Sequence, residues 1–163
     1  MKNQKKNKSF ISSLGHATRG FYDALRRERN LRVHFCIGNL ICYFAVFFGI
    51  TRIEWAVLFA TISSVITCEL LNSAVEKTVD TATHEYRIDA KHAKDFAAAA
   101  TLVSAVFAVL IGIVLFGDFS KILMALLKIF TNPIGIVVLL VLIIIDLRIL
   151  FINVKIIKHR RKK

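Results

Sequence analysis

The sequence predicts an all-α integral membrane protein in which an amphipathic surface helix precedes four transmembrane helices. Hydrophobic residues make up 56% of the 163 residues, and the chain has only seven glycines and one proline. Most of the apolar residues form long uninterrupted blocks rather than a stripe at helical spacing, which is the pattern of membrane spans. This composition excludes a disordered or fibrous protein.

Basic residues are concentrated at the two ends of the chain. Lys and Arg total 23 against 11 Asp and Glu, which gives a formal net charge of +12. Nine of the basic residues precede Val33 and six follow Phe151. Positive charge beside the spans anchors a protein to the anionic cytoplasmic leaflet, so no nucleic-acid partner is indicated.

The first element is predicted between a lysine-rich lead, residues 1–9, which we expect to be disordered, and the first span. Over residues 10–29, apolar side chains recur at helical spacing: Phe10, Leu14, Ala17, Phe21, Ala24 and Leu25. This spacing predicts an amphipathic helix lying on the membrane surface.

The spans follow in order at about residues 33–50, 54–79, 96–117 and 134–154. Only residues 51–53 separate the first two spans, which predicts a tight helical hairpin. A charged connector, residues 84–95, precedes the third span. Residues 118–133 are expected to be a mixed loop with a short interfacial helix at 122–130, and Pro133 suits the start of the fourth span.

The distribution of Lys and Arg predicts the orientation. Nine before Val33, three in the connector (Arg87, Lys91, Lys94) and six in the basic tail, residues 155–163, fall on one side. Arg52, Lys121 and Lys128 fall on the other. The positive-inside rule then places both termini in the cytoplasm of a multi-pass cell-membrane protein.

A row of polar residues lies at the cytoplasmic end of the second span: Glu69, Asn72, Glu76 and Asp80. At 100° per residue all four project from one face of a helix. The run from Trp55 to Cys68 carries no charge and spans about 21 Å, so Glu69 is expected at the edge of the hydrocarbon. Carboxylates stacked on one face repel each other unless a cation lies among them.

These residues, together with Lys94 and Asp95 of the connector, indicate phosphoryl transfer. Carboxylate oxygens bind Mg²⁺, a lysine neutralises phosphate, and a metal-free carboxylate can accept the proton of an attacking hydroxyl. The structural alternative is that the acids only pair with Arg29, Arg32 or Lys94. No zinc motif, phosphate-binding glycine loop or hydrolase nucleophile elbow occurs.

The stretch Glu69-Leu-Leu-Asn72-Ser-Ala-Val-Glu76-Lys-Thr-Val-Asp80 resembles the signature of the prokaryotic diacylglycerol kinase and undecaprenol kinase family. Ala93-Lys94-Asp95 is similar to its second conserved block, and residues 28–34 (Glu-Arg-Asn-Leu-Arg-Val-His) resemble the Gram-positive undecaprenol kinase branch. The similarity covers about residues 13–117. It implies a lipid kinase domain at residues 10–117 and a homotrimer of three-span protomers with active sites between subunits at the cytoplasmic face.

The resemblance also implies roles for individual residues. Glu69 would be the general base. Glu28 and Glu76 would hold the Mg²⁺ that bridges the ATP phosphates, and Asn72 would orient groups around them. The rest of the site would comprise Lys94 at the phosphates, Asp95 at the nucleoside, Glu85 and Tyr86 beside the nucleotide, and Asp80 and Arg32 in support.

Two features depart from the family pattern. His16 stands where the family usually has an aromatic residue, so its role is uncertain. The fourth span, within residues 118–154, and the basic tail extend beyond the usual chain. Asp146 and Arg148 in that span are expected to lie near the cytoplasmic interface or to pair with a neighbouring span, and a role in lipid access is the alternative.

The function we predict is transfer of the γ-phosphoryl group of MgATP to a lipid alcohol, with undecaprenol favoured. One alternative is a diacylglycerol kinase that makes phosphatidic acid. The other, from a different class, is a non-catalytic membrane interaction protein in which the acids form structural pairs.

Overall fold

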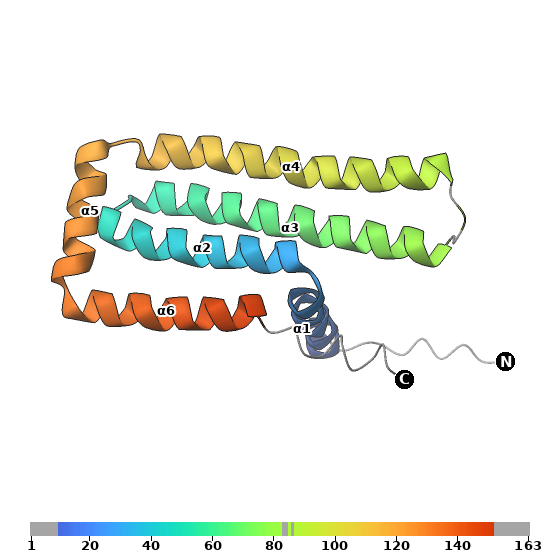
Figure 1. Cartoon of the computed structure of the whole chain (residues 1–163), viewed down its shortest axis with the longest axis horizontal. Coiled ribbons are helices and arrows are strands. Elements are labelled where there is room, and N and C mark those ends of the chain that lie inside the picture. Colours follow the sequence, from blue (N-terminus) through green and yellow to red (C-terminus); the bar gives the residue numbers. More distant parts are fainter. Residues whose placement is uncertain (1–9, 83–84, 86, 152–163) are drawn as a thin grey trace.

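The computed structural model describes residues 10–82, 85 and 87–151, and every regular element in these ranges is an α-helix (Figure 1). The helices are α1 (Phe10–Arg27), α2 (Arg29–Phe48), α3 (Arg52–Ala82), α4 (Ile88–Phe116), α5 (Phe119–Thr131) and α6 (Pro133–Phe151). Four of them, α2, α3, α4 and α6, are long and apolar enough to cross a membrane. The predicted all-α membrane architecture is therefore confirmed, whereas the predictions for the lead, the basic tail and Tyr86 fall outside the described residues.

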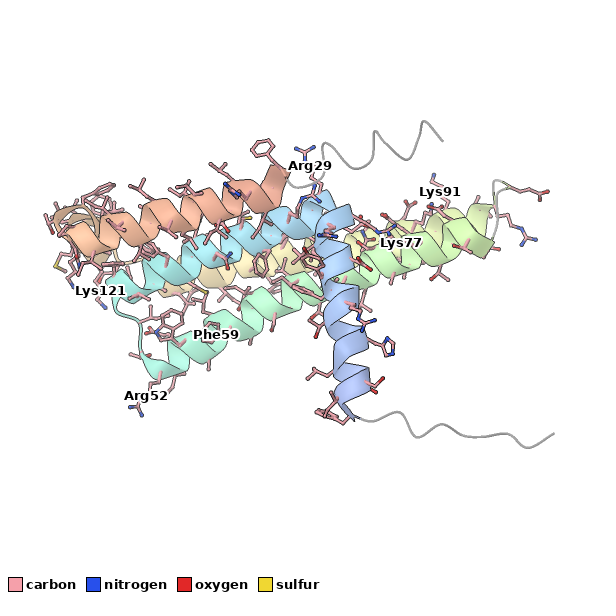
Figure 2. The ribbon with its side chains drawn as sticks, turned by 90° about the horizontal axis from the view of Figure 1, so that it is seen from below. Arg29, Arg52, Phe59, Lys77, Lys91 and Lys121 are labelled. Carbon is pink, nitrogen blue, oxygen red and sulfur yellow. The ribbon has the colours of Figure 1, made fainter. Side chains whose placement is uncertain are left out.

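The four spans lie side by side in the order α4, α3, α2, α6 (Figure 1). Helix α5 crosses one end of this row and joins α4 to α6, and α1 lies across the spans at the other end (Figures 1 and 2). Helix α3 has 31 residues and α4 has 29. Each is therefore about 45 Å long, which exceeds the roughly 30 Å thickness of the hydrocarbon core. Their ends project together beyond α2, on the side where the acids of α3 lie.

A single extended residue separates α1 from α2. Glu28 has φ −98° and ψ 114°, so the surface helix ends at Arg27 and the next helix starts at Arg29. Arg32 holds this corner, since its Nη1 donates hydrogen bonds of 3.1 Å to the carbonyl oxygens of Leu25 and Arg26. These carbonyls end α1 and have no partner within that helix.

The predicted tight hairpin between the first two spans is present. Gly49 closes α2 in the left-handed region, φ 79°, and its N–H donates to the carbonyl oxygen of Ala45. A reciprocal capping box then starts α3, in which the Thr51 N–H donates to Glu54 and the Glu54 N–H donates to the Thr51 hydroxyl. Glycine is suited to this turn because a side chain at positive φ is strained.

Two connections are more helical than the sequence predicted. Residues 88–95, expected in the charged connector, form the first two turns of α4. Residues 119–131 form one helix rather than a loop with a short helix, begun by Asp118, whose side chain accepts from the Lys121 N–H. Hydropathy marks where the membrane begins, and a helix can continue past that point.

The fourth span packs against α2 through polar contacts. Asn39 Nδ2 donates to Asp146 Oδ1 at 3.0 Å, and the Tyr43 hydroxyl donates to the carbonyl oxygen of Gly135 at 2.7 Å. Asp146 therefore pairs with a neighbouring span, which is one of the two positions expected for it. Arg148, two residues further on, is exposed.

Candidate active site

The acid face of α3 becomes steadily more exposed toward its C-terminal end. Glu69 is 3% exposed and Asn72 8%, Glu76 is half-buried, and Asp80 is exposed. Asn72 Nδ2 donates to Glu76 Oε1 at 3.4 Å, so these two side chains meet one turn apart. The helix thus presents one carboxylate at a buried, apolar depth and others toward water.

The first turns of α2 supply the remaining neighbours of Glu69. The side chains of Asn30 and His34, one helical turn apart, and the carboxylates of Glu76 and Glu28 all lie within electrostatic range of the Glu69 carboxylate. Asn30 and His34 were identified in the sequence only as part of the resemblance block, not as site residues. The two residues are four positions apart, so they lie on one face of α2. This spacing was the sequence signal that could have identified them as neighbours of the acids.

Glu28 reaches α3 through an ion pair that the sequence analysis missed. Lys77 Nζ lies 2.6 Å from Glu28 Oε1, which joins the corner between α1 and α2 to the residue after Glu76 (Figure 2). The Glu28 side chain is 24% exposed. Because Lys77 occupies one oxygen of the Glu28 carboxylate, it competes with any cation that binds there.

The other predicted residues are distributed along the projecting ends of α3 and α4. Lys94 forms an ion pair with Asp80 that bridges these two helices. Asp95 and Glu85 are exposed, and both are close in sequence to the residues of this ion pair. The structural alternative therefore holds for Asp80, whereas Glu69 and Glu76 form no ion pair among the described residues.

Two predicted residues lie apart from the acid cluster. The Arg32 guanidinium is directed to the end of α1, as described above, so its observed contacts are structural. His16 is exposed on α1, and no contact described in the structure joins it to the acids.

The oxygen atoms of the site fit a hard cation. Asn72 Oδ1 is buried without a hydrogen-bond partner, and it belongs to the residue that contacts Glu76. Among the described residues no three acidic, histidine or cysteine side chains lie close enough to bind a metal by themselves. Mg²⁺ characteristically takes one or two protein oxygens and completes its shell with water and substrate phosphates, so the two oxygens present are compatible with it.

These features define a class of protein, an all-α membrane protein whose acidic site lies where a span leaves the hydrocarbon. The model of the prokaryotic diacylglycerol kinase family matches residues 15–116, and the chain belongs to this family. It is therefore a membrane lipid kinase, with ATP as the phosphoryl donor. Helices α5 and α6 lie outside the match.

Three curated relatives are similar over most of the matched region. An undecaprenol kinase of Bacillus subtilis is 42% identical over 109 residues, covering 66% of this chain and 87% of the relative. A diacylglycerol kinase of Synechocystis is 37% identical over 105 residues, covering 64% and 60%. A diacylglycerol kinase of Pseudomonas aeruginosa is 32% identical over 97 residues, covering 60% and 79%. No solved structure gives a significant match.

Proposed function

We propose that this lipid kinase transfers the γ-phosphoryl group of MgATP to undecaprenol and releases undecaprenyl phosphate and ADP. The observation that carries the proposal is the position of Glu69, a carboxylate only 3% exposed at the end of an apolar run. The similarity to an undecaprenol kinase supports the choice of alcohol. Residues 28–34, which resemble the undecaprenol kinase branch, supply Asn30 and His34 beside that carboxylate.

The depth of Glu69 suits a base for a membrane alcohol. The hydroxyl of such a lipid lies at the edge of the hydrocarbon, where we place Glu69. Glu76 lies seven residues further along α3, or about 10 Å, where water-soluble ATP can reach. One helix face thus brings a lipid substrate and a soluble substrate together.

The reaction we propose is direct in-line transfer. The hydroxyl oxygen attacks the γ-phosphorus, the bond to the bridging oxygen of ADP breaks, and Glu69 accepts the hydroxyl proton. Mg²⁺ bound with ATP would neutralise phosphate charge. Glu76 and Glu28 would hold this ion, and Asn72 would orient them.

The remaining residues would bind the nucleotide. Lys94 would leave Asp80 to contact the phosphates, Asp95 would contact the nucleoside, and the stretch Glu85-Tyr86 would lie beside the nucleotide. This set requires the projecting ends of α3 and α4 to lie in the cytoplasm, together with both termini. The excess of Lys and Arg on that side supports the orientation.

We also propose that the protein works as a homotrimer. The apolar side chains of α4 are largely exposed in the single chain: Phe96 at 71% and Val114 at 83% are examples. Surfaces of this kind face either lipid or further subunits. Among the described residues no three metal-binding side chains gather, so a site shared between copies would add protein ligands to the two oxygens already present.

The decisive experiment measures transfer of labelled γ-phosphate to undecaprenol and to dioleoylglycerol, side by side, in detergent micelles with Mg²⁺. We expect faster labelling of undecaprenol, and almost none from Glu69→Gln. The matched control is Glu54→Gln, an acid at the opposite end of the same helix, which should keep wild-type activity. Labelling of undecaprenol that does not depend on Glu69 would contradict the mechanism.

A diacylglycerol kinase is the second candidate, favoured by the relatives from Synechocystis and Pseudomonas aeruginosa. Preference for dioleoylglycerol in the same assay would establish it in place of the undecaprenol kinase. The chemistry and the role of Glu69 would be the same in both.

A further inference from the structure

The described part of the chain divides into two bodies, each of which packs more closely within itself than against the other. Helices α3 and α4 form one body and lie side by side along their length (Figure 1). The hydroxyls of Ser64 and Ser104, 3.2 Å apart, and the ion pair of Lys94 with Asp80 join these two helices. Helices α1, α2, α5 and α6 form the other body, in which the polar contacts described above join α2 to α6.

Within the described residues the chain passes between these bodies twice, and both passages lie at the end of the molecule that α5 covers (Figure 1). Residues 49–51 join α2 to α3, and Gly117 and Asp118 join α4 to α5. Gly49 has φ 79°, and a Cβ on Gly117 would lie 2.7 Å from the carbonyl oxygen of Ile113, so glycine is required in both passages. Hinges consist of a few residues of this kind at the ends of elements. We call this end of the molecule the hinge end.

Side chains hold the two bodies together at the hinge end. The rings of Phe44 and Phe48 on α2 meet the ring of Phe116 on α4, with centroids 5.6 and 5.1 Å away. Lys121 Nζ of α5 lies 6.0 Å from the centroid of the Phe48 ring. The spacing between α2 and α4 is therefore fixed close to the hinge residues.

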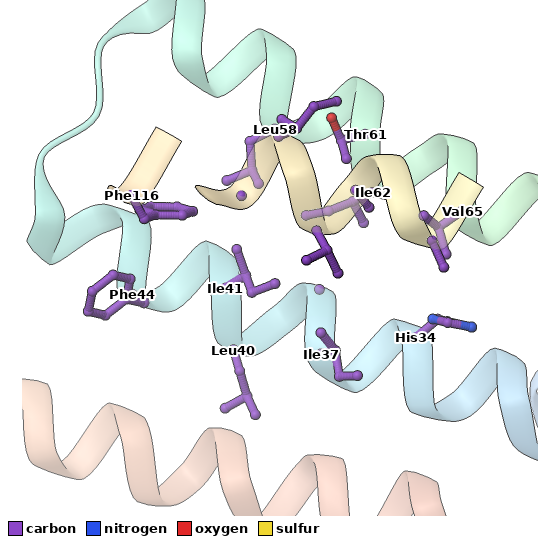
Figure 3. A pocket seen from close by; sticks show the side chains of 16 residues that line it. His34, Ile37, Leu40, Ile41, Phe44, Leu58, Thr61, Ile62, Val65 and Phe116 are labelled. Carbon is purple, nitrogen blue, oxygen red and sulfur yellow. The ribbon is translucent and has the colours of Figure 1, made fainter. Parts of the chain in front are cut away.

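Away from the hinge end the two bodies are less closely packed. An apolar cavity of about 460 Å³ lies between α2, α3 and α4, with Phe44 and Phe116 at one end and His34 at the other (Figure 3). Side chains that border empty space lack contact partners on that side, so they resist displacement less than those of a filled core.

Beyond the cavity, α3 and α4 project past α2, and we call this end the open end. The ion pair of Lys77 with Glu28 joins the two bodies there (Figure 2). Both side chains are partly exposed, so the pair favours the joined arrangement by about fivefold at most. A ligand that binds to both bodies can therefore replace it.

We propose that the two bodies rotate about the hinge end to admit MgATP, with residues 49–51 and 117–118 as hinges and the pair of Lys77 with Glu28 as the contact that opens. The inference rests on the proposed function and adds the movement that lets the nucleotide enter. The proposed metal ligands belong to different bodies, Glu28 to one and Glu76 to the other. An ion held by both favours the closed arrangement, because it binds that arrangement more tightly than the open one.

A small rotation is enough, since the acids lie far from the hinges. Glu76 lies about 36 Å along α3 from the start of this helix at Arg52. A rotation of about 5° displaces a group at that distance by about 3 Å, which is enough to break an ion pair. The same rotation leaves the phenylalanine contacts beside the hinges almost unchanged.

Distances between paired spin labels test this movement in the full chain, diluted with unlabelled chains in phosphatidylglycerol vesicles. The three native cysteines are first replaced by alanine. Labels at Arg27→Cys and Lys91→Cys report on the open end, and labels at Val46→Cys and Val114→Cys report on the hinge end. All four positions are exposed, so the labels disturb no packing.

The decisive comparison uses protein without nucleotide. Lys77→Gln should broaden the distances at the open end by about 3 Å and leave those at the hinge end unchanged. Lys77→Arg keeps the charge, and Lys121→Gln removes a lysine whose ion pair lies within one body, so both should behave like the wild type. Broadening at both ends, or at neither, would overturn the hinge.

The ligand arm adds Mg²⁺ and a non-hydrolysable ATP analogue to Lys77→Gln. The distances at the open end should become narrow again, because the ion now joins the two bodies. Distances that stay broad although a fluorescent ATP analogue is bound would overturn the closure on MgATP. A wild-type protein that transfers phosphate to neither alcohol would instead overturn the proposed function, since the comparison without nucleotide does not depend on it.

A second readout fixes the hinge end and measures activity. A short thiol crosslink between Phe44→Cys and Phe116→Cys should leave phosphate transfer within about twofold of the same double variant without the crosslink, because that end does not open. Loss of transfer on crosslinking would show that the bodies separate at the hinge end and would overturn the inference.

Discussion

Glu69 differs from the other acids of α3 in the depth at which it lies. Glu76 and Asp80 become progressively more exposed along the same face, whereas Glu69 lies among α2 and α3 side chains. A carboxylate at that depth is costly to maintain, and intramembrane acids are usually functional for this reason. Asn30 and His34 beside it are the groups that can act on its charge.

Substituting Glu69 should separate chemistry from nucleotide binding. If it is the general base, Glu69→Gln should lower kcat by about 10²- to 10⁴-fold, because the isosteric amide cannot accept a proton. Binding of a fluorescent ATP analogue should stay near wild type. A comparable loss of nucleotide affinity would instead place Glu69 among the metal ligands.

Lys77 should set how easily Glu28 takes up a cation. The 2.6 Å pair is partly exposed, so the pair contributes at most about 1 kcal/mol to stability. Lys77→Gln should leave the melting temperature nearly unchanged and lower the Mg²⁺ concentration that gives half-maximal activity, because the Glu28 carboxylate is released. An increased KM for ATP would show that Lys77 binds phosphate instead.

At the scale of helices, α2 uses two faces for two different neighbours. One face is apolar and faces α3, and a Cβ on Gly38 of this face would lie only 3.0 Å from the Ile62 side chain. The other face carries Cys36, Asn39 and Tyr43 toward α6. Polar contacts of this kind fix the position of a helix in lipid, where apolar residues have no preference between lipid and protein.

The contact between Asn39 and Asp146 should dominate the docking of α6. Asp146 is 4% exposed, and its Oδ2 already has no hydrogen-bond partner. Asn39→Leu leaves the buried carboxyl with no partner on either oxygen, which should cost about 1–3 kcal/mol. Asp146→Leu should cost less, because only a neutral amide is left unpaired.

The double variant Asn39→Leu/Asp146→Leu should be more stable than Asn39→Leu alone. Thermal unfolding in one detergent measures all three, with Arg148→Leu at an exposed position as the control. Equal and additive losses would show that the two side chains are not coupled.

At the scale of the whole molecule, α5 and α6 lie away from the acid cluster. Helix α6 packs on the side of α2 opposite α3, and the family match ends before α5 begins. The kinase domain proposed at residues 10–117 should therefore keep its chemistry without them. Their removal would expose Asn39 and Tyr43 to lipid, where unpaired polar groups are unfavourable.

A chain truncated after Gly117 tests this directly. We expect a trimer by light scattering and a kcat near that of the full chain, together with a lower melting temperature. A truncated protein that is folded and trimeric but inactive would show that the fourth span completes the site.

Much of the architecture follows from local patterns. Apolar blocks of membrane length predicted all four spans, and the spacing of Glu69, Asn72 and Glu76 predicted a shared face, because hydropathy and the 3.6-residue period act within one helix. The bounds of α4 and α5 were less well predicted, since nothing in the hydropathy ends a helix at the membrane surface.

The sequence by itself therefore determined the membrane class, the order of the helices and the row of acids on α3. Only the tertiary structure decided that Lys77 pairs with Glu28, 49 residues away, and that Asp146 meets Asn39, 107 residues away. It also decided that an apolar cavity lies between α2, α3 and α4, with His34 in its wall. The physical reason is that these contacts depend on how each helix is rotated against its neighbours, and side chains distant in the chain set that rotation together.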